Sequence, residues 1–374
     1  MDLRFLLRKN FMNILDDIKA IKKLDKSNML GSIDLLHQQV AQAWRETKGI
    51  KLPASYRKIN KVVINGMGGS GLGAHIIQSL YFNELKIPLA NIHSYDLPGI
   101  VDKNTLYIIS SYSGETEEPL AAFSQAKKKG AKILGITTGK KLGELISSGK
   151  VIGYLFSPKY NICDQPRIGI GYLVAGLLGL LRQFRVIQIS DQEIFRAVLF
   201  LKKKKKRFGA KNVLRSNIAK QVALAIKNKI PVVVVADFLA GNAHLMANQI
   251  NENAKNFSNY SIIPEMNHHL MEGLANPKIN GKNLKFIFIE SVFYNKKNQE
   301  RIEITKRVLS KNKVGYVSCR LAGKTKLEQS FEMLSFGSYV SFYLAMLNNI
   351  NPAPVPWVDY FKKELTRAPL INKT

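Results

Sequence analysis

Cysteine is nearly absent from this sequence. Its 374 residues include only two, Cys163 and Cys319. Two thiols are too few for a disulfide framework or a cysteine-based zinc site. The H-E-x-x-H pattern of helical zinc enzymes is also missing. We therefore expect no metal centre, no cofactor and a reducing, cytoplasmic environment.

Long apolar runs are missing as well. The most apolar stretch, residues 168–181 (IGIGYLVAGLLGLL), is closed by Arg182 and is shorter than the roughly 20 residues that cross a bilayer. The first residues, MDLRFLLRKNFMNILDDIK, contain three aspartates and no small-residue cleavage site. We predict a buried helix at 168–181, an amphipathic docking helix at the start and no membrane association.

Acidic residues are scarce relative to basic ones. There are 27 Asp and Glu against 56 Lys and Arg, for a formal net charge of +29, so anions from nucleic acids to sugar phosphates are attracted. The lysines are scattered except in residues 202–207 (KKKKKR), without the interleaved arginines and aromatics of a nucleic-acid surface. We expect no nucleic-acid partner and read 202–207 as the solvated face of a helix.

The residues that are present alternate between strand and helix patterns. Short β-branched runs at 61–65, 105–110, 131–138 and 151–157 are separated by turns and helical stretches, which predicts a parallel sheet with helices on both faces. The alternation repeats after Pro231, with runs at 231–237, 285–291 and 313–319. The length also suits two domains.

We therefore predict an α/β protein of two similar lobes, each with a mostly parallel sheet flanked by helices. The expected divisions are an N-terminal helical segment (1–54), a first domain (55–189), a helical connector (190–230), a second domain (231–350) and a C-terminal extended segment and helix (351–374).

A glycine-rich turn, residues 66–71 (GMGGSG), follows the first strand and opens a helix. Glycines let the backbone approach an anion, and the amides of a helix N-terminus point at it. The turn also matches G-x-G-x-x-G, and Asp96 lies where a dinucleotide-binding fold places its ribose-binding acid. An NAD site is therefore an open alternative.

A hydroxyl-rich turn, residues 110–116 (SSYSGET), follows the next strong strand and again opens a helix. Two such turns at neighbouring strand ends can surround one phosphate, whereas each alone could be a capped helix start. The pair favours a phosphate site.

These turns resemble a known family. GMGGSGLG and SYSGETEE are similar to the G-M-G-G-S-x-x-G and S-Y-S-G-N-T-E-E signatures of sugar isomerase (SIS) domains in bifunctional phosphoglucose/phosphomannose isomerases. The resemblance continues in the same order through QPRIGIGYL, NENAKN, PEMNHH and PVPWVDYFKKEL. It implies two SIS-type lobes and interconversion of glucose 6-phosphate, and of mannose 6-phosphate, with fructose 6-phosphate through an enediolate.

The resemblance also implies a catalytic set. Glu252 matches the base that moves the proton between C1 and C2, and His268 matches the ring-opening histidine, reaching across a homodimer interface. Lys362 would assist at the ring oxygen, and Arg167 would stabilise the enediolate. Without the family, each of the four residues could be an ordinary surface, cap or interface residue. The implied phosphate ligands are Gly68, Gly69, Ser70, Ser111, Ser113 and Thr116.

Several positions depart from the family pattern. Glu115 stands where Asn is usual, and it would repel a phosphate unless it turns outward. His269 and Leu270 replace Asn and Glu, and Asn351 and Ala353 replace Asp and Thr. Because these changes surround the sugar end, a non-catalytic SIS protein that binds a sugar phosphate as a signal is the alternative function.

Overall fold

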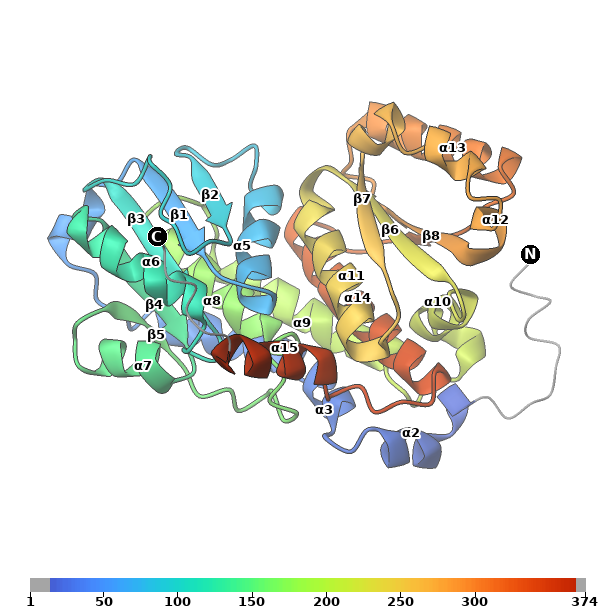
Figure 1. The fold of residues 1–374 in the computed structure, drawn as a ribbon, viewed down its shortest axis with the longest axis horizontal. Helices are drawn as coiled ribbons and strands as arrows, with labels where there is room; N and C mark the ends of the chain where they lie inside the picture. The colour runs from blue at the N-terminus through green and yellow to red at the C-terminus, as the bar shows by residue number, and fades with distance from the viewer. Residues whose placement is uncertain (1–13, 368–374) are drawn as a thin grey trace.

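The computed structural model describes residues 14–367. Two α/β lobes lie side by side (Figure 1), and the predicted fold class is confirmed. The expected docking helix falls partly on residues 1–13, outside the described residues. Residues 14–47 are helical, in a short 3-10 helix (Ile14–Asp16) and in α2 (Ile18–Leu24), α3 (Met29–Asp34) and α4 (Leu36–Thr47).

The first lobe holds a five-stranded parallel sheet in the order β2-β1-β3-β4-β5. The elements in chain order are β1 (Lys61–Asn65), α5 (Gly69–Leu80), β2 (Leu89–Ile92), β3 (Thr105–Ser110), α6 (Glu117–Lys128), β4 (Lys132–Thr137), α7 (Lys140–Ser147), β5 (Ile152–Leu155) and α8 (Ile170–Gln183). The strand order reverses between β1 and β3. In open α/β sheets, ligands bind at such a switch point, outside the carboxyl ends of the strands.

The second lobe holds a four-stranded parallel sheet in the order β7-β6-β8-β9. Its elements are α10 (Ile218–Ala225), β6 (Ile230–Ala236), α11 (Ala240–Ala254), β7 (Asn259–Ile263), α12 (Asn280–Asn283), β8 (Leu284–Glu290), α13 (Lys296–Lys311), β9 (Gly315–Arg320) and α14 (Lys326–Leu347). The last described helix, α15 (Pro356–Arg367), follows this lobe in sequence but lies below the strands of the first lobe in Figure 1.

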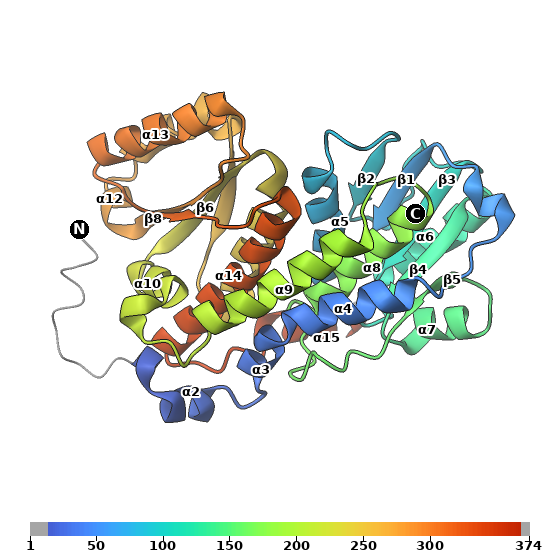
Figure 2. The same cartoon turned by 180° about the vertical axis from the view of Figure 1, so that it is seen from behind.

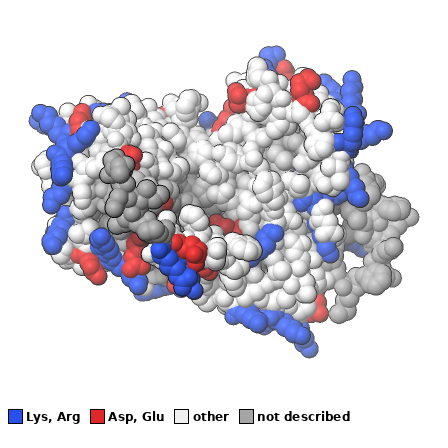
Figure 3. Space-filling model, viewed as in Figure 1, with Lys and Arg blue, Asp and Glu red and all other residues white. Residues whose placement is uncertain are grey.

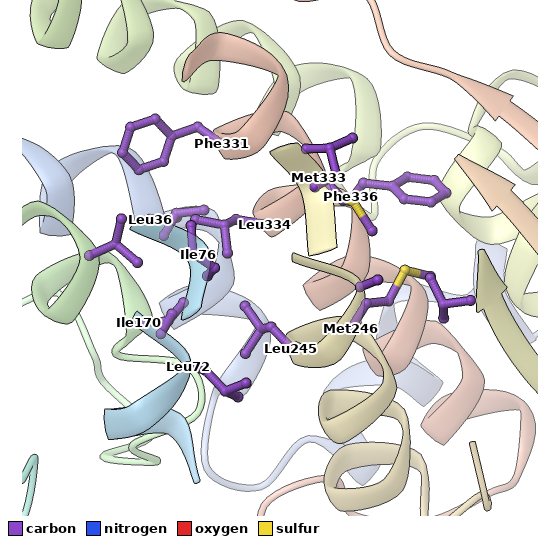
Figure 4. Close-up of a cluster of buried hydrophobic side chains, with 14 of the residues drawn as sticks. Leu36, Leu72, Ile76, Ile170, Leu245, Met246, Phe331, Met333, Leu334 and Phe336 are labelled. Atoms are coloured by element: carbon purple, nitrogen blue, oxygen red, sulfur yellow. The ribbon is translucent and has the colours of Figure 1, made fainter. Parts of the chain in front are cut away.

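Helices from both lobes share one hydrophobic core. Leu72 and Ile76 of α5 meet Leu245 of α11 and Leu334 of α14 (Figure 4). The crossing of α5 and α11 is close because Gly241 has no side chain: a Cβ there would lie 2.4 Å from the backbone of His75 and Ile76. The two lobes are thereby held in one fixed arrangement.

The predicted buried helix is confirmed as α8, whose residues from Ile170 to Leu181 are all buried. Within residues 14–367, no helix combines the length and apolar character that a membrane crossing requires. Cys163 and Cys319 are buried free thiols.

The connector helix α9 (Asp191–Phe208) runs behind both lobes, beside α4 and α14 (Figure 2). The expectation of a solvated lysine face is wrong for Lys204, which is buried and paired with Glu332 of α14. Successive residues of a helix point about 100° apart, so a run of six lysines and arginines must send one toward the neighbouring helix.

Candidate active site

The glycine-rich turn (residues 66–71, the glycine turn) and the hydroxyl-rich turn (residues 110–116, the serine turn) converge at the switch point of the first sheet. β1 and β3 are neighbours, so both turns leave the same sheet edge. The Ser70 hydroxyl accepts a hydrogen bond from the N–H of Tyr112 at 2.9 Å, and the Ser110 hydroxyl donates to the carbonyl of Ser70 at 2.9 Å. The predicted convergence of the two turns is therefore seen directly.

Donors for an anion remain free in these turns. The N–H groups of Gly68, Gly69 and Ser113 have no acceptor among the described residues. In the second turn the Ser111 hydroxyl accepts from the N–H of Gly114 at 3.0 Å and lies 2.7 Å from the Thr116 hydroxyl. Free amides at the start of α5, with hydroxyls beside them, are the kind of donors that bind a phosphate.

The serine turn depends on glycine at position 114. Gly114 has φ +76°, a conformation that residues with side chains rarely adopt. A Cβ at this position would lie 1.9 Å from the carbonyl oxygen of Gly139. No other residue fits there without moving the turn.

Glu115 lies at the surface of the molecule. Its carboxylate is exposed and lies 3.9 Å from the ammonium of Lys140. The repulsion between the Glu115 carboxylate and a bound phosphate is therefore reduced, because this carboxylate faces solvent and lies near the Lys140 ammonium.

Arg167 links the first lobe to the second. Its backbone lies against Gly69, since a Cβ on Gly69 would come 3.4 Å from the Arg167 Cα. Its side chain is 3% exposed and passes into the second lobe. There Nε donates to Oδ1 of Asn253 at 2.6 Å, and Nη1 lies 3.5 Å from Oε2 of Glu252.

The remaining N–H groups of Arg167 hold the segment before α15. Nη2 donates to the carbonyls of Pro352 at 2.9 Å and Ala353 at 2.7 Å, and Nη1 donates to Oε1 of Gln165 at 2.7 Å. Because the acceptors in the C-terminal segment are backbone carbonyls, Ala353 serves as well as Thr would.

Glu252 lies near the end of α11, with its side chain 33% exposed. Burial raises the pKa of this carboxyl above its ordinary value, while the charges of Arg167, Lys255 and Lys362 lower it. Of these cations, only Lys362 belongs to α15. A carboxylate with a raised pKa is suited to exchanging protons near neutral pH.

Lys255 lies beside Glu252, although it was not among the residues predicted for the site. Its ammonium donates to the carbonyls of Glu252 at 2.7 Å and Pro352 at 3.0 Å. Burial and the charge of Arg167 lower the pKa of Lys255 to about 8. The only signal was its place in NENAKN, three residues after Glu252.

His268 is not brought to Glu252 within one chain. Glu252 precedes β7, whereas His268 ends the short 3-10 helix (Glu265–His268) that follows β7. The five residues of β7 span about 16 Å at the usual rise of a strand. Glu252 and His268 therefore lie toward opposite ends of β7. His268 and His269 are both exposed.

The candidate site consists of backbone amides and hydroxyls of the two turns in the first lobe and of charged side chains between the lobes. Within residues 14–367, no three His, Cys, Asp or Glu side chains gather as a metal ion would require.

Family models match both halves of the chain. Residues 55–152 match the SIS domain, and residues 215–365 match the bacterial phospho-glucose isomerase C-terminal SIS domain. Solved structures share the fold at low identity. The C-terminal domain of glucosamine-fructose-6-phosphate aminotransferase from Francisella tularensis superimposes with a TM-score of 0.66 at 13% identity, covering 87% of this chain and 98% of that one.

Relatives are similar over nearly their whole length. A bifunctional phosphoglucose/phosphomannose isomerase of Caldicellulosiruptor bescii is 33% identical over 341 residues, which cover 90% of this chain and 98% of the relative. The enzyme of the same name from Thermoplasma acidophilum is 28% identical over 320 residues, covering 85% and 94%. On this likeness, the chain belongs to the bifunctional phosphoglucose/phosphomannose isomerase family.

Proposed function

We propose that this protein interconverts glucose 6-phosphate, and also mannose 6-phosphate, with fructose 6-phosphate through an enediolate. The observation that carries the proposal is the meeting of the two anion-binding turns with the Arg167–Glu252 pair at one place between the lobes. The relatives from Caldicellulosiruptor bescii and Thermoplasma acidophilum are named for the same reaction.

In this proposal the phosphate sits at the two turns. The free N–H groups of Gly68 and Gly69 and the hydroxyl groups of the serine turn bind it. Hydroxyl ligands are Ser70, Ser111, Ser113 and Thr116. Backbone amides at a helix N-terminus suit a dianion because their positive ends converge on it.

The sugar then extends toward Glu252. The carboxylate takes the proton from one of C1 and C2 and returns it to the other, and the charge of Arg167 stabilises the enediolate between these steps. Arg167 acts through its charge, because its N–H groups already have acceptors in Asn253, Gln165 and the C-terminal segment. Lys362 supplies a proton at the ring oxygen.

We further propose a cytoplasmic homodimer in which His268 of the partner subunit opens the sugar ring. Within one chain, Glu252 and His268 lie toward opposite ends of β7. In addition, α15 has no buried residue, and Trp357 on it is 80% exposed. Large apolar side chains left in solvent favour contact with another chain.

The test is isomerase activity on both hexose 6-phosphates in the presence of a chelator, for the wild type and Glu252→Gln. We expect the wild type to turn over and the variant to lose activity by about 10³-fold, the usual contribution of a positioned base. Calorimetry should find fructose 6-phosphate binding nearly unchanged. Glu300→Gln, at an exposed glutamate of α13, is the matched control.

Binding without turnover in the wild type would select the signal-binding function instead. An active Glu252→Gln enzyme would remove Glu252 from the mechanism, and binding of NADH would favour the dinucleotide alternative.

A further inference from the structure

The second lobe leaves one sheet edge without a neighbour. Its order β7-β6-β8-β9 repeats the first lobe's β2-β1-β3-β4, but the first lobe adds β5 beside β4. In the second lobe the chain passes from β9 directly to α14. In the described part of the chain, no strand pairs with the outer side of β9. An open edge offers backbone N–H and carbonyl groups to any extended segment.

A groove follows this edge. Two adjoining cavities, of about 360 and 520 Å³, share Ile218, Gln221 and Ser318 in their walls. All six residues of β9 line one wall, and α10 lines the other. At the usual rise, β9 is about 20 Å long, the length of an ordinary strand that could lie beside it.

The groove is strongly basic. Its charged lining consists of seven cations and one carboxylate. The cations are Lys204, Arg207, Lys227, Lys229, Lys285, Lys313 and Arg320. The carboxylate, Glu332, is already paired with Lys204 and accepts the N–H groups of Ala322 and Gly323. Figure 3 shows blue side chains gathered where Figure 1 places α10 and α12.

Lys285 illustrates the unmatched charge. Its side chain lies across Gly315 at the start of β9. Burial and the neighbouring Lys229 lower its pKa, so its ammonium is held where a positive charge is disfavoured. Among residues 14–367, no carboxylate contributes to the shift at Lys285, whose only charged influence is Lys229. Apart from Lys204, which pairs with Glu332, and Arg320, which lies 3.8 Å from Glu290, the cations of the groove have no carboxylate within ion-pair distance in the described part of the chain.

We propose that this groove is a docking site for an extended acidic segment of another protein, which joins β9 as a fifth strand. The segment's backbone would hydrogen-bond to the open edge, as in other complexes formed by strand addition, and its carboxylates would pair with the lysines. A nucleic acid would meet the charge but would leave the backbone groups of β9 unpaired. The site lies apart from the Arg167–Glu252 pair and is independent of the proposed isomerase activity.

Fluorescence anisotropy with the full-length protein tests the proposal. The probe is a fluorescein-labelled peptide of alternating Glu and Val, about eight residues long so that it spans β9. A second peptide carries a methyl group on every backbone nitrogen, which keeps its charges and removes its backbone donors. A single-stranded DNA of equal charge is the third probe. The measurements are made at about 0.15 M salt, which weakens binding that depends only on long-range attraction between charges.

Two protein variants separate this groove from the general charge of the molecule. Lys285→Glu/Lys313→Glu reverses two charges in the groove. Lys22→Glu/Lys23→Glu makes the same change at exposed lysines of α2 that do not line it. Isomerase activity and circular dichroism should be unchanged in both variants, because none of these lysines touches the candidate active site.

We expect the Glu-Val peptide to bind, and the methylated peptide to bind at least about tenfold more weakly since strand addition depends on backbone hydrogen bonds. The groove variant should also lose about tenfold, and the α2 variant less than about twofold. Equal binding of the methylated peptide, equal losses in the two variants or tighter binding of the DNA would each overturn the proposal. So would an absence of peptide binding, which would mean that the lysines only protect the edge from pairing.

Discussion

Glu252 is a partly buried carboxylate whose protonation is set by the cations around it. Burial raises its pKa, and Arg167 makes the largest opposing contribution. The base acts in its ionised form, so activity is lost as the pH falls through this pKa. In Arg167→Gln the opposing charge is gone and the pKa rises further. The acidic limb of the kcat/KM profile should therefore move to higher pH by about one unit or more.

Arg167→Lys is the control for that shift, because it keeps the charge and loses the fork of hydrogen bonds. Its acidic limb should stay close to the wild-type position even if its overall rate falls. An unmoved limb in Arg167→Gln would mean that another group sets the acidic side of the profile. Circular dichroism of each variant checks that the loss of four internal hydrogen bonds has not unfolded the site.

Lys255 is a positioning residue that ties the end of α11 to the segment leading to α15. Its pKa of about 8 means that this ammonium is lost as the pH rises through that value. Lys255→Arg keeps its charge at higher pH, since the guanidinium titrates far above this range. We expect the activity of Lys255→Arg to persist to higher pH than that of the wild type.

Lys255→Met separates positioning from charge. Without the two hydrogen bonds, the segment that carries Lys362 is held less firmly, and kcat/KM should fall by about tenfold because small misplacements of catalytic groups are costly. Thermal unfolding should change little, because the ammonium of Lys255 is only partly buried. A basic limb that is the same in Lys255→Arg and the wild type would show that a different group sets it.

At the scale of elements, the sequence predicted the strands that lie in recognisable β-branched or apolar runs. The runs at 61–65 and 105–110 coincide with β1 and β3, and those in the second half lie close to β6, β8 and β9. The two strands that were missed, β2 and β7, are the edge strands beside β1 and β6. Their sequences, LANI and NYSII, are interrupted by Asn or Ser, so neither leaves a continuous apolar run to recognise.

The role of the serine turn can be tested by a substitution that adds a single carbon atom to it. Gly114→Ala places a Cβ where the carbonyl of Gly139 lies and imposes a strained φ. The turn must then shift, and the hydroxyls of Ser111 and Thr116 with it. We expect the KM for glucose 6-phosphate to rise by at least about tenfold, as when a positioned binding group is displaced by about 1 Å.

Gly99→Ala is the matched change, because nothing lies within 4 Å of a Cβ at that position. It should leave KM unaltered. If Gly114→Ala also keeps the wild-type KM, the serine turn does not bind the phosphate.

The arrangement of the whole molecule could be read from the sequence only in part. The two turns were predictable, because each follows a recognisable strand and neighbouring parallel strands end at one sheet edge. The placement of Glu252 beside Arg167 was not, since it depends on α11 packing against α5 through Gly241, a contact between residues far apart in the chain. Glu252 and Arg167 were singled out only by the resemblance to a family, because local sequence patterns do not show which distant residues meet.

The proposed homodimer makes a sharp prediction at this scale. Each active site would combine Glu252 of one chain with His268 of the partner subunit. Glu252→Gln and His268→Asn homodimers should then both have little activity, and each should keep the fold and mass of the wild-type dimer. His269→Asn, at the exposed neighbouring histidine, should stay active.

Mixing the two inactive variants and allowing the subunits to exchange should restore activity. Random exchange in a two-fold dimer makes half of the dimers mixed, and each mixed dimer holds one site with both Glu252 and His268 intact. The recovered rate should therefore approach about a quarter of the wild-type rate. If instead His268 acted within its own chain, every site would lack one of the two groups and mixing would recover nothing. Gel filtration before and after mixing confirms that the subunits remain dimeric, so a failure to recover activity would count against the shared site.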